Sequence, residues 1–161
     1  MDYVYVGKLV NTHGIKGEVR IISEFEYKER VFVVDFPIYI GNEKEKKIIK
    51  SYRHHKNFEM VTFEGINSIN EVLVYKGKNV YINKSDLKLD TNEYLETDLI
   101  DMDVYYKDNL IGKLNDIEKN GLNKLMVIND KLIPFNKHFI KNVNKKENKI
   151  ELDNVEGLLW E

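Results

Sequence analysis

Short apolar segments separated by polar turns run along most of the chain. The segments are rich in Val, Ile, Tyr and Phe, a composition typical of β-strands. In the first half, this pattern predicts strands over residues 3–10, 18–23, 37–40, 47–54, 59–63 and 79–82. In the second half, it predicts strands over residues 102–106, 110–118, 124–128, 132–134, 140–143 and 149–152. The chain is therefore expected to be mainly β.

One segment carries the signals of a helix. Ser68 and Glu71 have the spacing of a capping box, in which each side chain bonds a free backbone N–H at the start of a helix. Val72, Leu73 and Tyr75 would then share one face and pack on the strands. A short helix is therefore expected within the first set of strands.

A polar segment divides the chain. Residues 83–93, NKSDLKLDTNE, lack a convincing period and are typical of a linker. We predict a first domain over residues 1–83, a linker over 84–93 and a second domain over 94–161. Because unpaired strand edges invite aggregation, each set of strands should close on itself. The expected fold is two small β-barrels joined by a short linker, with a short helix in the first barrel and a short helical turn at the C-terminus.

Composition narrows the classes of function. The 161 residues hold 25 Lys and Arg against 27 Asp and Glu, a formal charge of −2, so any nucleic-acid contact must be local. The lack of cysteine excludes disulfides, a thiolate nucleophile and a sulfur-ligated zinc site. With four histidines and no cysteine, we expect no metal and no cofactor.

We expect no targeting signal in this chain. Its first residues lack the cationic and then apolar order of a signal peptide. No run approaches the roughly 20 apolar residues that a membrane span needs. We expect a cytoplasmic protein without membrane contact.

A glycine-rich loop offers the first candidate chemistry. In NTHGIKG, Gly14 and Gly17 can adopt backbone angles that other residues reach only with strain. His13 and Glu18 could form an acid–base pair, which would suit a small hydrolase. The same side chains could instead bond the loop backbone, and no nucleophile or metal ligand accompanies them. We interpret Gly14, Gly17 and Glu18 as a structural loop and keep the hydrolase as an alternative.

A lysine-rich segment offers the second candidate. In KEKKIIKSYRHHK, alternate side chains on a strand could meet phosphates while the tyrosine offers a stacking surface. A solvated hairpin edge guarded by lysines would show the same pattern. Adjacent histidines on a strand point to opposite faces, so His54 and His55 are not expected to chelate one ion. The candidate RNA-binding residues are His13, Lys16, Lys46, Lys47, Lys50, Tyr52, Arg53 and His55.

Two apolar clusters could anchor a protein partner. One follows the linker and the other lies at the end of the chain. Exposed aromatic and aliphatic side chains often anchor protein contacts, although the same residues could seal the second barrel. The candidate anchors are Tyr94, Leu95, Leu99, Ile100, Leu158 and Trp160.

Several segments together resemble one family. GKLVNTHGIKGEVRI resembles the N-terminal signature of the RimM family of ribosome maturation factors. The matching residues are Gly7, Lys8, His13, Gly14, Gly17, Glu18 and Val19. FEGINSINEVLVYKGKNVYI is similar to the helix and strand that close the family's first barrel. EYLETDLIDMDVYYKDNLIGKLNDI, LIPFNKHFI and NVEGLLW are similar to parts of its second, PRC-type barrel.

The resemblance includes three departures. Asp101 stands where the family usually has glycine. Leu95 follows Tyr94 where an aromatic pair is common. Asn144 stands where the family usually has aspartate near the last hairpin.

The resemblance implies a function as well as a fold. It implies a non-enzymatic assembly factor that binds the head region of the maturing 30S subunit and assists 16S rRNA processing. The implied partner is small-subunit ribosomal protein nineteen, held mainly through the second domain. We expect the free chain to be monomeric. A stand-alone RNA-binding β-barrel protein is the main alternative.

Overall fold

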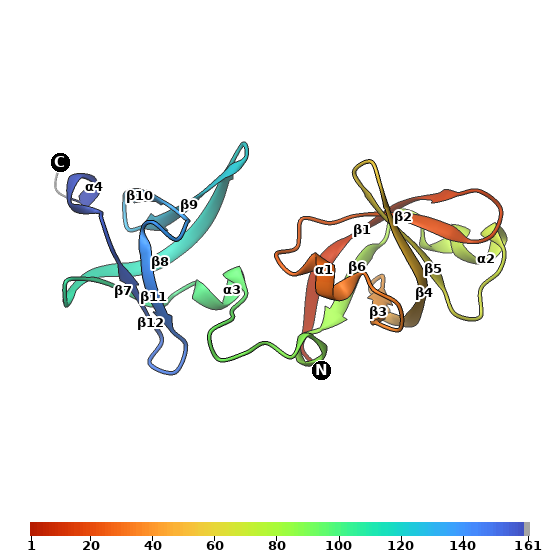
Figure 1. Cartoon of the computed structure of the whole chain (residues 1–161), viewed down its shortest axis with the longest axis horizontal. Coiled ribbons are helices and arrows are strands. Elements are labelled where there is room, and N and C mark those ends of the chain that lie inside the picture. The colour runs from red at the N-terminus through yellow and green to blue at the C-terminus, as the bar shows by residue number, and fades with distance from the viewer. Residues whose placement is uncertain (160–161) are drawn as a thin grey trace. The chain divides into compact units, whose positions relative to one another are not determined.

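The computed structural model describes residues 1–159. It divides into two units, Met1–Lys88 and Leu89–Glu161, each built around its own sheet (Figure 1). Strands dominate both units, which confirms the predicted fold class. All helices are short, and within residues 1–159 none is long and apolar enough to cross a membrane.

The first unit is a closed antiparallel barrel. Its strands are β1 (Tyr3–His13), β2 (Glu18–Ile22), β3 (Pro37–Ile40), β4 (Glu45–His55), β5 (Phe58–Phe63) and β6 (Asn79–Asn83). They are hydrogen-bonded in the order β1-β2-β5-β4-β3-β6, and β6 returns to β1. Leu9, Ile21, Ile38, Phe63 and Ile82 are among the side chains buried in the core. Because this sheet closes on itself, it has no unpaired edge strand. The barrel predicted for the first half of the chain is confirmed.

Strand β1 bends so that it can pair with two neighbours. Its register shifts between Tyr5 and Gly7 on the β6 side and between Leu9 and Asn11 on the β2 side. A Cβ atom at Gly7 would lie only 2.5 Å from the carbonyl oxygen of Ile22. Glycine is therefore needed where β1 approaches β2 most closely.

The predicted helix is present. α2 (Ile69–Val72) continues into the 3₁₀ turn η1 (Leu73–Tyr75). The backbone N–H of Asn70 donates to the Ser68 hydroxyl at 3.3 Å, so Ser68 caps the helix, but through Asn70 and not through the reciprocal bonds with Glu71 that a capping box has. Val72 and Tyr75 are buried, but Leu73 is exposed and does not share their packed face.

Two further turns of helix in the first unit were not predicted, and neither was α3 (Glu96–Leu99) in the second. α1 (Lys28–Val31) brings Val31 and Phe32 into the core of the first unit. The 3₁₀ turn η2 (Lys84–Leu87) occupies the start of the segment expected to be a linker, and its Leu87 is buried. Lys88 is the last residue of the first unit, and Leu89 begins the second.

The second unit is a six-stranded sheet. Its elements are α3 (Glu96–Leu99), β7 (Asp103–Tyr106), β8 (Asn109–Asn120), β9 (Asn123–Ile128), β10 (Lys131–Pro134), β11 (Ile140–Asn144), β12 (Lys149–Leu152) and α4 (Glu156–Leu159). The strand order is β10-β9-β8-β7-β12-β11. Among the strands of residues 89–159, β12 and β7 are the one pair of neighbours that run parallel. Within residues 89–159 the hydrogen-bonded order ends at β10 and β11, so this sheet does not close as the first does. α4 is the predicted C-terminal helical turn.

The apolar cluster after the linker belongs mostly to the core. Leu95 is 2% exposed and Leu99 is 0% exposed. The prediction that they are docking anchors is therefore wrong, because both side chains are buried in the core. Tyr94 and Ile100 are half-buried, and both pack against the core of this unit. Leu99 lies in α3, and Leu95 and Ile100 flank it in extended conformation.

The second apolar cluster lies at the end of the chain. Leu158 on α4 is 40% exposed. Trp160, the other candidate anchor there, lies outside the described residues. Of the six candidate anchors, Leu158 is thus the one with a largely accessible side chain in residues 1–159.

Leu99→Ala should lower the free energy of unfolding of the second unit by about 2–5 kcal/mol, because it leaves a cavity in a closed core. Leu158→Ala is the matched control, and its exposed side chain predicts a change below about 0.5 kcal/mol. Urea unfolding of the full-length chain, followed by circular dichroism, measures both. Equal effects of the two variants would contradict the assignment of Leu99 to the core.

Candidate functional site

A tight loop joins β1 to β2. Gly14 and Gly17 both have positive φ, at 69° and 91°, as the sequence indicated. A Cβ atom at Gly17 would lie 3.2 Å from a methyl carbon of Ile66. The backbone N–H of Ile69, at the start of α2, donates to the carbonyl of Ile15 at 3.0 Å. This geometry supports the structural reading of the two glycines, because it fixes the loop against α2.

An arginine from β4 bonds the carboxylate at the start of β2. The Nε and Nη2 atoms of Arg53 donate to the two oxygens of Glu18 at 2.9 and 2.8 Å. This hydrogen bonding holds the pKa of Glu18 below its usual range and raises the pKa of Arg53. Fork-to-fork pairs of this kind fix the orientation of the guanidinium.

A second arginine bonds His13. The Nη2 atom of Arg20 on β2 lies 2.8 Å from Nδ1 of His13, and its guanidinium carbon lies 5.5 Å from the centre of the Phe58 ring. Because arginine can only donate, His13 accepts through Nδ1 and carries its proton on Nε2. Arg20 is thus held by a histidine on one side and an aromatic ring on the other.

The two arginines each bond one member of the hypothetical acid–base pair. His13 faces Arg20, whereas Glu18 faces Arg53. In the described part of the chain, no hydrogen bond joins His13 to Glu18, so neither side chain orients the other as general acid–base chemistry would need. Within residues 1–159, no group of three or more His, Cys, Asp or Glu is placed to hold a metal ion.

Basic groups gather around the pair of arginines. The rings of His13 and His55 lie 6.5 Å apart. Burial lowers the pKa of His55 first, and the nearby charges of Arg53, Lys56, His13 and Arg20 lower it further. Lys16 lines a hollow of about 330 Å³ together with His13 and Glu18. We call this surface the cationic face, defined by His13, Lys16, Arg20, Arg53, His55 and Lys56.

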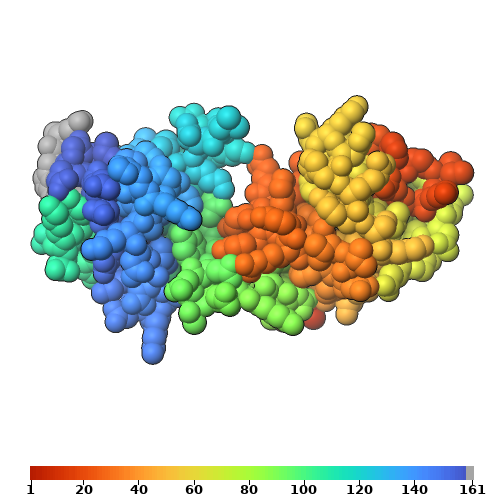
Figure 2. All heavy atoms as spheres, viewed as in Figure 1, coloured from red at the N-terminus to blue at the C-terminus, as the bar shows by residue number. Residues whose placement is uncertain are grey.

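The cationic face can bind an anion. It combines two oriented guanidinium groups with flexible lysines and contains one acid, Glu18. Phosphate oxygens suit such donors, and binding would offset the mutual repulsion of the cations. The turn between β4 and β5, which carries His55 and Lys56, projects from the surface of the first unit (Figure 2).

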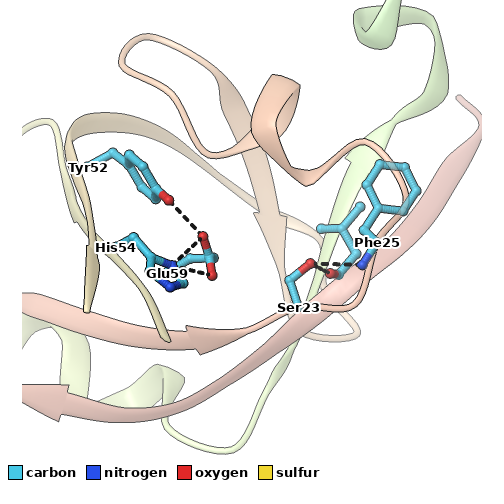
Figure 3. Close-up of polar contacts among 6 residues, drawn as sticks. Ser23, Phe25, Tyr52, His54 and Glu59 are labelled. Carbon is cyan, nitrogen blue, oxygen red and sulfur yellow. Dashed lines mark hydrogen bonds and ion pairs between the residues drawn. The ribbon is translucent and has the colours of Figure 1, made fainter. Parts of the chain in front are cut away.

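Tyr52 lies on the other side of β4. Its hydroxyl donates to the Glu59 carboxylate at 2.7 Å, and Nδ1 of His54 lies 3.2 Å from the same group (Figure 3). Glu59 is only 3% exposed. Burial and the bond to Glu59 raise the pKa of Tyr52 to about 12. The expected stacking surface at Tyr52 is therefore not beside Arg53, because adjacent strand residues face opposite ways.

The three other lysines of the predicted patch lie farther along β4. Lys46 pairs in register with Tyr39 and Lys47 with Ile38, at the opposite end of β4 from His55. At about 3.3 Å per residue, Lys46 and His55 lie up to about 30 Å apart along the strand. Lys50 lies between them and donates to Asn67 at 3.5 Å. The predicted patch is thus not a single surface, and Lys46, Lys47 and Lys50 stand apart from the cationic face.

Each of the two units matches a family of known protein domains. The RimM N-terminal domain family matches residues 4–87, and the RimM PRC barrel domain family matches residues 96–158. The chain belongs to the RimM family. The resemblance noted in the sequence is thereby confirmed for both halves.

Several RimM relatives align over nearly their full length, and each is named ribosome maturation factor RimM. The relative from Ligilactobacillus salivarius is 39% identical, with 98% of this chain and 99% of the relative covered. The relative from Staphylococcus haemolyticus is 37% identical, covering 97% and 98%. The relative from Shouchella clausii is 34% identical, covering 98% and 97%.

Two members of the cationic face in this RimM-family chain were not singled out from the sequence. Arg20 lies two residues after Glu18, so strand alternation already placed it on the same side. Lys56 follows His55 in the turn, with a positive φ of 54°. The alternation of side chains along β2 could have predicted that Arg20 lies on this face. The position of Lys56 depends on the conformation of the turn.

The pKa of His55 tests the cationic face. We expect it to lie below the ordinary value of 6.5, and to rise in Arg53→Gln because one neighbouring cation is removed. NMR titration of the imidazole resonances measures both values. Lys47→Gln, at the other end of β4, should leave the pKa unchanged. A pKa of 6.5 or above in the unmodified chain would show that His55 does not lie among these cations.

Proposed function

We propose that this chain is a non-enzymatic assembly factor that binds the maturing 30S subunit in the cytoplasm and assists 16S rRNA processing. The observation that carries the proposal is the match of both RimM modules over nearly the whole chain. Relatives that align from end to end are named ribosome maturation factors. This chain and its relatives have the same two domains in the same order. That common domain arrangement supports a common function.

In this proposal, the first unit contacts rRNA through the cationic face. The chain has a formal charge of −2, so its attraction to RNA must come from local groups. Arg53 and Arg20 are held in place by Glu18 and His13, and two such oriented guanidiniums suit phosphate oxygens. Lys16 and Lys56 add exposed cations beside them.

The second unit holds small-subunit ribosomal protein nineteen, at the head region of the subunit, through exposed leucines. α4 lies against β10, and each of these elements carries an accessible leucine. Leu158 on α4 is 40% exposed and Leu132 on β10 is 53% exposed. Exposed apolar side chains on neighbouring elements are typical anchors for a protein partner. Leu132 was not among the anchors expected from the sequence.

Binding alone suffices for this function. Two modest contacts on one chain reinforce each other, because the first raises the effective concentration of the second. Nδ1 of His13 and the carboxylate of Glu18 are each bonded to an arginine, which disfavours the hydrolase. The near-neutral charge disfavours a stand-alone RNA-binding protein.

Capture from the native cytoplasm tests the proposal. The tagged full-length chain should enrich immature small subunits and head proteins, including protein nineteen. Leu132→Asp combined with Leu158→Asp should lower the binding of purified protein nineteen about tenfold or more, because it puts charge into an apolar contact. Lys16→Gln combined with Arg53→Gln should instead weaken binding to 16S rRNA, with Lys76→Gln as the matched control.

The two double variants test the leucine surface and the cationic face independently of each other. Retention of protein nineteen by the leucine variant would contradict the assignment of that surface. Capture of no small-subunit component by the unmodified chain, or turnover of a small molecule by it, would overturn the proposed function itself.

A further inference from the structure

A groove runs beside the edge strand β11 of the second unit. It consists of two adjoining hollows of about 460 and 380 Å³. Asn92, Asn142 and Val143 line both, so the hollows are continuous. One wall is β11, and the other is the chain that enters this unit at residues 89–94. Within residues 89–159, no strand pairs with the outer side of β11.

Hydrogen bonds fix one end of the groove. The ammonium group of Lys145 donates to the backbone carbonyls of Asp90, at 3.1 Å, and of Glu93. The Glu93 carboxylate accepts from the backbone N–H of Asp90 at 3.0 Å. The turn between β11 and β12 is thus tied to the entering chain. A groove with fixed walls loses little conformational entropy when it binds a ligand.

Lysines lie along the whole groove. Lys137 and Lys141 line one hollow, and Lys145 and Lys146 line the other. All four are exposed, and within residues 1–159 no ion pair joins Lys137, Lys141 or Lys146 to a carboxylate. Asp90 is the one acid in the lining. The groove therefore favours an extended ligand with repeated negative charge.

The lining between the lysines suits nucleobases. The side-chain amides of Asn92 and Asn142 offer both donors and acceptors where the hollows meet. Phe135 and Val143 are half-buried there and supply apolar surface for a flat ring. Proteins that bind unpaired RNA combine such surfaces with cations along the backbone. An acidic peptide would match the lysines but would make no use of the half-buried aromatic ring.

We propose that this groove binds a short unpaired RNA strand, with phosphates on Lys137, Lys141 and Lys146 and bases against Phe135, Asn92 and Asn142. This rests on the proposed function and adds a second RNA contact, separate from the cationic face and from the leucines assigned to protein nineteen. The turn between β11 and β12 projects from the second unit (Figures 1 and 2).

Binding of a fluorescently labelled uridine oligonucleotide to the full-length chain tests the groove. Lys141→Gln combined with Lys146→Gln should weaken binding about tenfold and reduce the slope of log affinity against log salt by about 1.4, at about 0.7 for each lost phosphate contact. Lys119→Gln, near the far tip of the β8–β9 hairpin, is the matched control and should change neither. Ultraviolet light should crosslink the bound oligonucleotide to Phe135.

The outcomes distinguish this groove from the proposed function. Unchanged affinity and salt slope in the double variant, or equal losses in the control, would overturn the groove. Crosslinks confined to the first unit, or tighter binding of an acidic peptide than of the oligonucleotide, would also overturn it. Capture of immature small subunits by the unmodified chain is measured separately, so it can succeed while the groove fails.

Discussion

In the first unit, β1 is hydrogen-bonded to β2 along one side and to β6 along the other. This double pairing closes the barrel, and it is possible because Gly7 lets β1 approach the carbonyl of Ile22. The end of β1 then places His13 directly opposite Glu18. Strand β5 lies between β2 and β4, and its Met60 is in register with both Arg20 and Arg53. The cationic face therefore depends on the pairing of β1, β2, β5 and β4 and not on any single segment.

The cationic face also shows how a nearly neutral chain can present concentrated charge. Glu18 neutralises only part of it and holds Arg53 in one orientation. His13 does the same for Arg20 without adding a negative charge. Ordering these long side chains before a partner arrives reduces the entropy lost on binding. On the opposite side of β4, Tyr52 and His54 serve a different purpose, because they satisfy the buried carboxylate of Glu59.

Most strands could be predicted because period-two alternation survives in short segments, whereas the four-residue α1 shows too little of a helical period to be recognised. Leu95 and Leu99 could not be assigned, since an apolar pair looks the same whether it seals a core or awaits a partner. The predicted RNA-binding residues of β4 do not form one surface, because Lys46 and His55 lie at opposite ends of the strand. A bulge between Ile49 and Ser51 shifts the register of β4, so Ile49 is buried while Arg53, an even number of residues later, is exposed.

The parallel pairing of β7 with β12 has a consequence for synthesis. It joins Asp103 to Lys149, so the middle of the second sheet contains strands from opposite ends of that unit. The first unit can fold as soon as β6 leaves the ribosome that makes it. The second must wait until Lys149–Leu152 has emerged, and contacts between residues so distant in sequence form slowly. The nascent chain thus passes through a stage with one finished module and one open module, whose exposed strands need protection from aggregation.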